Sequence, residues 1–217
     1  MGRNEWRAEQ EWPLARTQFT PWYLHAGGRL SAVAPAGDGA IFNYTYDPRN
    51  PVPTLGGNIM RPEVRGAYDQ APLDARTDIL RFVSEPLEGP MEITGPIRAT
   101  LYASSDARDT DFMAKLIVVK ADGRAINLVD GVIRARYRDS FREARLLTPG
   151  EIYPFELDLW ATSYELAPGD RLRVDITSSN FPRLNRNPNT GAPFAETTEL
   201  RKARQTIYAG PAYPSHV

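Results

Sequence analysis

The chain has 217 residues, and its 26 Lys and Arg against 27 Asp and Glu give a formal net charge of −1. Without an excess of positive charge, neither a nucleic-acid backbone nor an anionic membrane surface is expected as a partner. Cysteine is absent and the only histidines are His25 and His216, which excludes disulfides, a cysteine nucleophile and a metal centre built on several histidines. No apolar run approaches the roughly 20 residues that span a bilayer. The sequence therefore predicts no bound metal and no cofactor.

The first half of the chain contains several short segments with strand character. Residues 30–34 and 40–46 flank a glycine-rich turn, and residues 79–83 form a further apolar stretch before a proline-rich turn. In residues 97–103, apolar side chains alternate with polar ones, which is the pattern of a strand with one buried face. We expect each of these segments to be a strand.

The second half repeats this pattern. Residues 111–120 include four consecutive apolar side chains and lead into an Asp-Gly turn, which predicts a strand covered on both faces that begins a hairpin. Residues 152–161 and 172–176 alternate and predict strands with one buried face. The last segment, residues 195–208, is predicted as a helix or a final strand.

Eight or more short strands, with 19 prolines scattered among them and no amphipathic helix, indicate an all-β fold. The predicted architecture is an antiparallel jelly-roll β-sandwich over residues 25–217. Residues 1–24 differ, because their aromatic side chains follow no period of 2 or 3.6. They are predicted to be an irregular arm that packs against another surface.

No residue is predicted to be catalytic. A serine nucleophile commonly lies in a Gly-x-Ser-x-Gly turn, with a histidine to take its proton, and no serine of this chain lies in such a turn. No Ser-x-x-Lys is present. A triad formed by His25 or His216 with a distant serine and acid stays open, although His25 fits an edge position and His216 lies beside the terminus.

Two polar clusters allow either ligand binding or a structural role: Asp106, Asp109 and Asp111 in one loop, and Arg134, Arg136 and Arg138 along one expected strand. The aspartates offer oxygen ligands for Ca²⁺, but Arg108 among them favours a loop held by backbone hydrogen bonds. The arginines would suit an anion site or a row of salt bridges. An outward-facing surface or an inter-domain row of salt bridges is favoured, because Asp130, Asp139 and Glu143 lie nearby.

Four aromatic side chains support an alternative function, because a β-sandwich can stack exposed aromatic rings on sugars: Trp22, Tyr44, Tyr46 and Trp160. Such a chain would be an autonomous carbohydrate-binding module. Burial against a neighbouring domain would explain large aromatic residues equally well.

Ordered sequence blocks carry a more specific signal: Asn4–Arg7, Glu11–Leu14, Tyr46–Pro48, Pro51–Gly57, Tyr68–Gln70, Asp78–Leu80, Asp109–Leu116, Asp122–Ala125, Asp130–Arg138 and Ser178–Pro182. In this order they resemble the C-terminal domain of the X-Pro dipeptidyl-peptidase, cocaine esterase and α-amino-acid ester hydrolase superfamily. The resemblance spans nearly the whole chain.

That resemblance implies a modular serine hydrolase, in which an α/β-hydrolase domain carries the nucleophile and a galactose-binding-domain-like jelly roll follows at the C-terminus. The chain looks like the last part only, a fragment that is inactive alone. Its implied partner is the α/β-hydrolase domain of the same polypeptide, and the implied substrate of the whole enzyme is a small ester, amide or peptide. Oligomeric state is left open, including a homo-oligomer. Localisation is also left open, with the cytoplasm favoured over export.

By the same resemblance, the jelly roll supports the hydrolase domain and forms one wall of the substrate cleft. Met60 and Arg61 match the positions that line the acyl pocket in cocaine-esterase-like relatives. Those relatives have apolar groups there, so Arg61 would suit an acidic substrate group or would point to solvent. Trp6, Trp12 and Trp22 are expected to pack against the hydrolase domain.

Overall fold

The computed structural model describes residues 1–193 and 196–217. The described chain is all-β, with three short 3₁₀ turns and no α-helix in those ranges. Its strands are β1 Tyr23–His25, β2 Arg29–Ser31, β3 Ala40–Tyr46, β4 Leu80–Val83, β5 Met91–Ser105, β6 Asp111–Val119, β7 Ala125–Arg134, β8 Tyr153–Leu166, β9 Arg171–Thr177, β10 Ala203–Gly210 and β11 Tyr213–Pro214. The 3₁₀ turns are η1 Ala26–Gly28, η2 Ala71–Leu73 and η3 Ala135–Tyr137.

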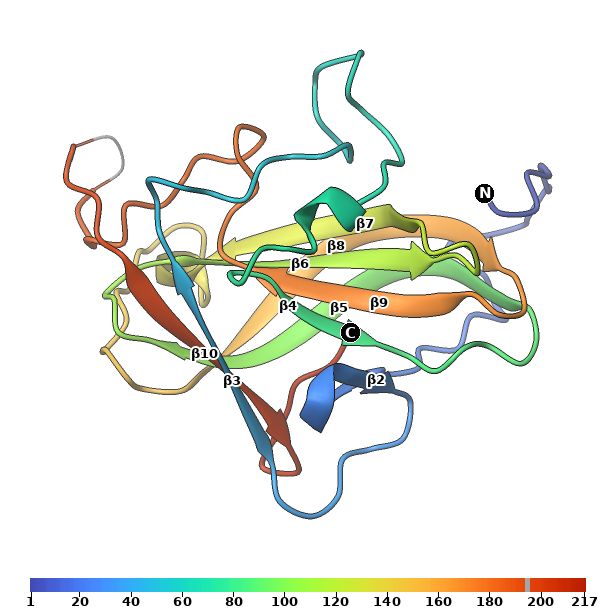
Figure 1. Ribbon diagram of the computed structural model, residues 1–217, viewed down its shortest axis with the longest axis horizontal. Coiled ribbons are helices and arrows are strands. Elements are labelled where there is room, and N and C mark those ends of the chain that lie inside the picture. Colours follow the sequence, from blue (N-terminus) through green and yellow to red (C-terminus); the bar gives the residue numbers. More distant parts are fainter. Residues whose placement is uncertain (194–195) are drawn as a thin grey trace.

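The strands form two sheets that pack face to face (Figure 1). One sheet has the order β1-β2-β4-β9-β6-β7, and the other has the order β11-β10-β5-β8 with β3 paired to β10. The predicted sandwich-like, all-β class is therefore confirmed. The expectation of purely antiparallel pairing is wrong between β2 and β4, which run parallel where Arg29 pairs with Val83, and at an isolated parallel bridge between Pro53 and Phe181.

Most of the predicted strands are present. The segment 40–46 matches β3 residue for residue, and the hairpin predicted after residues 111–120 is the β6–β7 pair. The segment 97–103 is only the middle of the 15-residue β5. Of the two alternatives for residues 195–208, the final strand is present as β10, which begins at Ala203, and the helix is wrong for the described residues. Ala195 lies outside the described residues.

The core lies between the two sheets, where alternating apolar side chains of both point inward. Leu172, Val174 and Ile176 of β9 are at most 2% exposed, as the alternation predicts. From the opposite sheet, Phe155 of β8 is fully buried, and its ring centroid lies 4.7 Å from that of Phe112 on β6. These contacts join the sheets through a continuous apolar layer.

The outer face of the six-stranded sheet is also covered. The chain between β3 and β4, residues 47–79, rises above this sheet and includes η2 (Figure 1). We call this segment the excursion. Under this excursion a second, smaller core forms from Val52, Leu73 and Ile79. The prediction that β6 is covered on both faces is therefore confirmed, since eight of its nine residues are buried. Polar residues on the outer face of β9 are buried for the same reason.

Candidate functional site

A projecting loop carries the two residues predicted to line a cleft. An antiparallel bridge closes the loop, with the Gly57 amide donating to the Gly66 carbonyl at 2.7 Å and the Gly66 amide donating back at 2.9 Å. We call residues 57–66 the 57–66 loop. Met60 is 98% exposed on it, and Arg61 is exposed beside Glu63, with Nη2 2.9 Å from Glu63 Oε1. In Figure 1 this part of the chain extends away from both sheets.

The narrow base of the 57–66 loop depends on glycine. Gly56 has φ +65° and Gly57 has φ +80°, values that side chains with a Cβ rarely adopt. A Cβ on Gly56 would also lie 2.5 Å from the Gly66 carbonyl oxygen and 2.7 Å from Tyr68 Cβ. The Gly56-Gly57 pair is therefore needed for the two ends of the loop to lie so close together.

Beneath the excursion, charged side chains of alternating sign follow one another across the sheet. In the strand register, Lys115 of β6 lies between Asp130 of β7 and Asp175 of β9, and Asp175 also faces Arg81 of β4. The Asp130, Lys115 and Asp175 residues are all less than 8% exposed. We call the row from Asp130 to Arg81 the charge ladder. Opposite charges on neighbouring strands stabilise one another, and burial raises the cost of removing either partner.

Further charges complete the charge ladder at both ends. The Arg183 guanidinium donates to the Asp130 carboxylate. Arg173 donates to both carboxylate oxygens of Asp175, at 2.6 and 2.9 Å, and to Asp74 at 2.7 Å. Asp74 also accepts a hydrogen bond from Arg81. Since Asp74 belongs to the excursion, the ladder ties the excursion to the sheet.

The N-terminal arm is attached to the sandwich by its charged side chains. Arg7 binds both carboxylate oxygens of Glu92 on β5, at 2.9 and 2.6 Å, and Arg3 contacts Glu165 on β8 at 2.9 Å. The hydrogen bonds from Arg7, and one from Thr94, lower the pKa of Glu92 to about 2. The arginine side chains of the arm thus bind carboxylates of the sandwich in the same chain.

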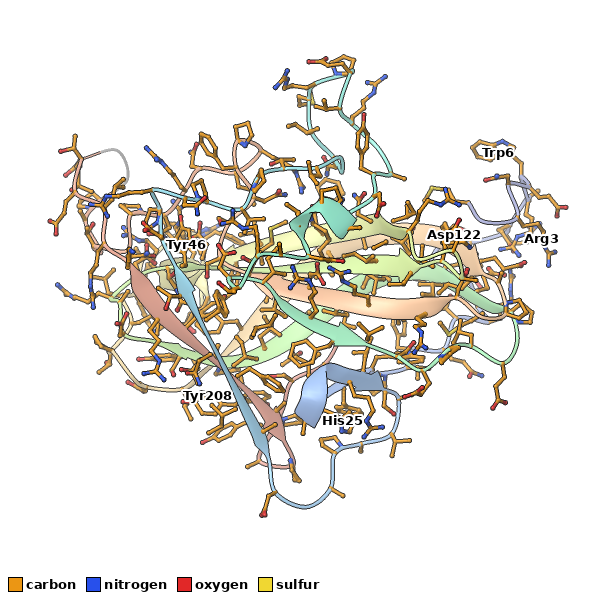
Figure 2. The ribbon with its side chains drawn as sticks, viewed as in Figure 1. Arg3, Trp6, His25, Tyr46, Asp122 and Tyr208 are labelled. Carbon is orange, nitrogen blue, oxygen red and sulfur yellow. The ribbon has the colours of Figure 1, made fainter. Side chains whose placement is uncertain are left out.

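The three tryptophans predicted to contact another domain occupy different environments. Trp6 is completely exposed and Trp12 is 55% exposed. Figure 2 shows Trp6 beside Arg3 at one end of the molecule, away from the sheets. Trp22 instead packs partly against the chain's own core, and its backbone pairs with Val217 at 2.7 and 3.0 Å. Trp6 and Trp12 are therefore part of the exposed apolar surface of the arm, together with Phe19 at 71% exposure.

The two polar clusters are largely combined into buried ion pairs. Arg134 binds Asp111 at 2.8 and 3.0 Å, and Arg136 binds Asp109 at 2.8 Å. Asp109 also accepts a hydrogen bond from the Arg136 backbone amide. The arginines do form salt bridges, but the expected outward-facing or inter-domain row is wrong for these two pairs, because Arg134 and Arg136 bind buried carboxylates of their own domain. The expectation that one strand carries all three arginines is wrong. Strand β7 ends at Arg134, Arg136 lies in η3, and Arg138 follows η3.

The remaining members of the clusters bind backbone groups. The Arg138 guanidinium donates to the carbonyls of Ala135 and Arg145. The Asp106 carboxylate accepts the Arg204 amide. Within residues 1–193 and 196–217, no group of three or more His, Asp or Glu side chains is arranged to hold a metal ion.

Three of the four aromatic residues considered for sugar stacking are not free. Tyr44 is 4% exposed and Tyr46 is 1% exposed, because both point into the core from β3. Trp22 is partly covered, which leaves Trp160 as the exposed member at 66%. The expected row of exposed rings does not form from these residues, because the inward face of β3 takes its tyrosines into the sandwich.

Both histidines bind backbone carbonyls rather than a serine and an acid. His25 Nε2 lies 3.0 Å from the Val33 carbonyl, and His216 Nδ1 lies 2.7 Å from the Pro214 carbonyl. The His216 ring also lies against Tyr23, with ring centroids 5.4 Å apart.

Over the part of the chain that the structure describes, there is no helix long and apolar enough to cross a bilayer.

Sequence reasoning did not identify Gln70, Lys115 and Asn127, whose side chains meet at the base of the 57–66 loop. Lys115 Nζ donates to Gln70 Oε1 at 2.7 Å, and Asn127 Oδ1 accepts the Tyr68 amide at 2.7 Å. A signal was present, because Lys115 interrupts an otherwise apolar strand predicted to be covered on both faces. A charged residue at such a position requires a buried partner.

Comparison with known proteins identifies the domain. All 217 residues match the family model for the X-Pro dipeptidyl-peptidase C-terminal non-catalytic domain. The chain belongs to this family. It is 42% identical to the cocaine esterase of Rhodococcus sp. strain MB1 Bresler, over 100% of this chain and 40% of that protein.

Two solved structures contain a domain with the same fold as this chain. An aminopeptidase from the marine sediment archaeon Thaumarchaeota archaeon has a TM-score of 0.89 and 31% identity over 99% of this chain and 38% of its own. An α-amino acid ester hydrolase has a TM-score of 0.89 and 34% identity over 99% of this chain and 39% of its own. The chain thus spans about two fifths of the relatives it matches, and corresponds to the non-catalytic C-terminal domain of such hydrolases.

Proposed function

We propose that this non-catalytic domain supports the α/β-hydrolase domain of the same polypeptide and forms one wall of its substrate cleft. The observation that carries this proposal is the division of the arm into two sides. Arg7 holds the arm on β5, while Trp6 is completely exposed and Trp12 is 55% exposed. Exposed large aromatic side chains on a pinned segment suit burial against a second domain.

The cleft-wall role is assigned to the 57–66 loop. Met60 is almost fully exposed at a point far from the sandwich core, which suits contact with a group outside this domain. Arg61 is partly neutralised by Glu63 at 2.9 Å, so its positive charge toward an acidic substrate group is reduced. We propose that the substrate is a small ester, amide or peptide, and that Met60 supplies the main apolar contact.

We further propose that the sandwich is a galactose-binding-like jelly roll preceded by an arm over residues 1–24. Strands β3 to β10 divide into the orders β3-β10-β5-β8 and β4-β9-β6-β7. This division supports two interlocked Greek keys, in which connections pass repeatedly from one sheet to the other. The last residues of the arm already belong to β1, and Leu24 is 1% exposed in the core.

Association between this chain and a separately produced catalytic domain of the same polypeptide tests the supporting role. Isothermal titration should show binding by the chain, weakened at least about tenfold when Trp6 and Trp12 are both changed to alanine. Val33→Ala is the matched control, because Val33 is 70% exposed in a different loop. Equal binding by the wild type and the double variant would contradict the role of the arm. A glycan-array signal with no such association would favour the carbohydrate-binding alternative.

A further inference from the structure

Gln70 lies at the neck of the 57–66 loop and joins its two ends. The side chain is fully buried, at 0% exposure. Its Nε2 donates to the carbonyl oxygen of Leu55, which precedes the loop, and to that of Tyr68, which follows it, each at 3.0 Å. A single side-chain amide therefore connects the incoming and outgoing segments.

Lys115 determines which way this amide points. The Lys115 ammonium approaches the Gln70 amide at 2.7 Å, and an ammonium carries only donors, so the atom that faces it must be the oxygen. The amide nitrogen must then face the Leu55 and Tyr68 carbonyls. A rotated amide would place its oxygen against two carbonyl oxygens and its nitrogen against an ammonium. The charge on Lys115 thus selects the orientation that holds the neck.

The surroundings of Lys115 fit this role better than that of an ordinary ion pair. Burial lowers the pKa of Lys115, which opposes its charge. Among the described residues, no carboxylate oxygen lies within 4.0 Å of its Nζ; Asp130 is bound by Arg183, and Asp175 by Arg173. Gln70 is therefore the direct acceptor of the ammonium. Placing a charge there costs free energy that an apolar residue would avoid.

Backbone contacts carry the effect from Gln70 to the loop. The Gln70 backbone amide donates to the Ala125 carbonyl at 2.7 Å. Asn127 donates its backbone amide to the Tyr68 carbonyl and accepts the Tyr68 amide with its side-chain oxygen. Two residues before Tyr68, Gly66 forms the bridge that closes the loop. The same few residues therefore fix both the sheet edge and the base from which Met60 projects.

We propose that Gln70 and Lys115 are positioning residues: Gln70 clasps the neck of the 57–66 loop, and Lys115 orients the clasp. The loop then holds Met60 and Arg61 at a fixed place relative to the sandwich. The effect on substrate binding rests on the proposed function, whereas the clasp does not.

Hydrogen exchange of the full-length polypeptide tests the clasp without reference to activity. Lys115→Met removes the ammonium but leaves Asp130 and Asp175 with their arginines, so the sheet is expected to fold. Gln70→Glu keeps an acceptor for Lys115 but has no donor for the carbonyls of Leu55 and Tyr68. Both variants should speed exchange of the Gly57, Gly66 and Tyr68 amides at least about tenfold, with β6 and β9 amides unchanged.

The matched control is Lys202→Met, because the Lys202 side chain is 65% exposed and pairs with Asp47, which is not a residue of the loop. It should leave these three amides unchanged. Exchange at the wild-type rate in both variants would overturn the clasp. A uniform rise in the exchange rates of β6 and β9 amides would also overturn the clasp, because Lys115 and Gln70 would then stabilise the whole sheet.

Steady-state kinetics of the same full-length variants test the consequence for substrate. Loss of the clasp should raise KM several-fold and leave kcat within about twofold, because the loop contacts bound substrate in ground state and transition state alike. Faster loop exchange with unchanged KM would leave the clasp standing and contradict the cleft-wall role. Unchanged exchange would contradict the clasp whatever the kinetics show.

Discussion

Gly131 of β7 lies against the backbone of Asp158 on β8, so that the edges of the two sheets meet at this point. A Cβ at residue 131 would lie 2.1 Å from the Asp158 carbonyl oxygen and 2.7 Å from its carbonyl carbon. Neither atom belongs to a flexible side chain, so only a backbone shift would make room. The sandwich is closed along this edge because residue 131 has no side chain.

Gly131→Ala should lower the free energy of unfolding by about 2–3 kcal/mol, because the added methyl group overpacks a backbone contact. Urea denaturation followed by circular dichroism measures this change. Gly89→Ala is the control, since Gly89 has no atom near its Cβ position and should change stability by less than about 0.5 kcal/mol. Equal stability of the two variants would show that the sheet edges can move apart without cost.

Attachment of the arm should depend on pH through Glu92. The folded pKa of about 2 lies below the ordinary value of 4.5, because Arg7 and Thr94 hydrogen bond to the carboxylate. A carboxylate with a lowered pKa stabilises the attached arm fully above pH 4.5, and this contribution is lost as the pH falls toward 2. Protection factors for the arm amides, measured by hydrogen exchange at several pH values, should decline over that interval.

Glu92→Gln provides the comparison for the pH series. Without a carboxylate at residue 92, the arm should already be less protected at pH 7, and its protection should change less between pH 4.5 and 2. A steep decline that persists in Glu92→Gln would assign the pH dependence to other groups, such as Glu9 beside Arg16.

The isolated chain should not hydrolyse p-nitrophenyl esters or an X-Pro anilide. His25 and His216 both bind backbone carbonyls, and no serine of the chain occupies a nucleophile turn. Assays with and without a serine-directed inhibitor measure this directly. Turnover that the inhibitor blocks would mean that the chain contains its own nucleophile.

Arg61 and Glu63 are expected to set the preference for charged substrates. Glu63→Gln removes the carboxylate 2.9 Å from Arg61, so the guanidinium should attract an acidic acyl group more strongly. In the full-length polypeptide, kcat/KM for an acidic ester relative to a neutral one should rise about threefold to tenfold. Arg61→Ala should remove that rise, and a rise that survives it would exclude Arg61 as its source.

Local periodicity was sufficient to predict most of the sandwich. Strand β3 and the β6–β7 hairpin follow from alternation, an apolar run and an Asp-Gly turn, all of which lie within a few residues of one another. The parallel contact of β2 with β4 was not predicted, because it joins Arg29 to Val83 and depends on how the sheet is assembled. The family resemblance correctly placed the chain among non-catalytic C-terminal domains.

The outer face of the six-stranded sheet was harder to predict. Arg173 and Asp175 alternate with apolar residues on β9, which is the usual pattern for a face in water, yet both are buried under the excursion. Lys115 and Gln70 are 45 residues apart, so no local pattern brings them together. The register of β4, β9, β6 and β7 lines up the charge ladder, and the tertiary path of the chain between β3 and β4 covers it and brings Gln70 to Lys115.

The ratio of kcat/KM for a long-chain and a short-chain acyl ester, in full-length Met60→Ala compared with wild type, tests the cleft-wall role most directly. Removal of an apolar contact should lower the preference for the long acyl group at least about fivefold, while Val33→Ala leaves the ratio unchanged. An unaltered ratio in Met60→Ala would contradict the account, because Met60 would then make no contact with the acyl group.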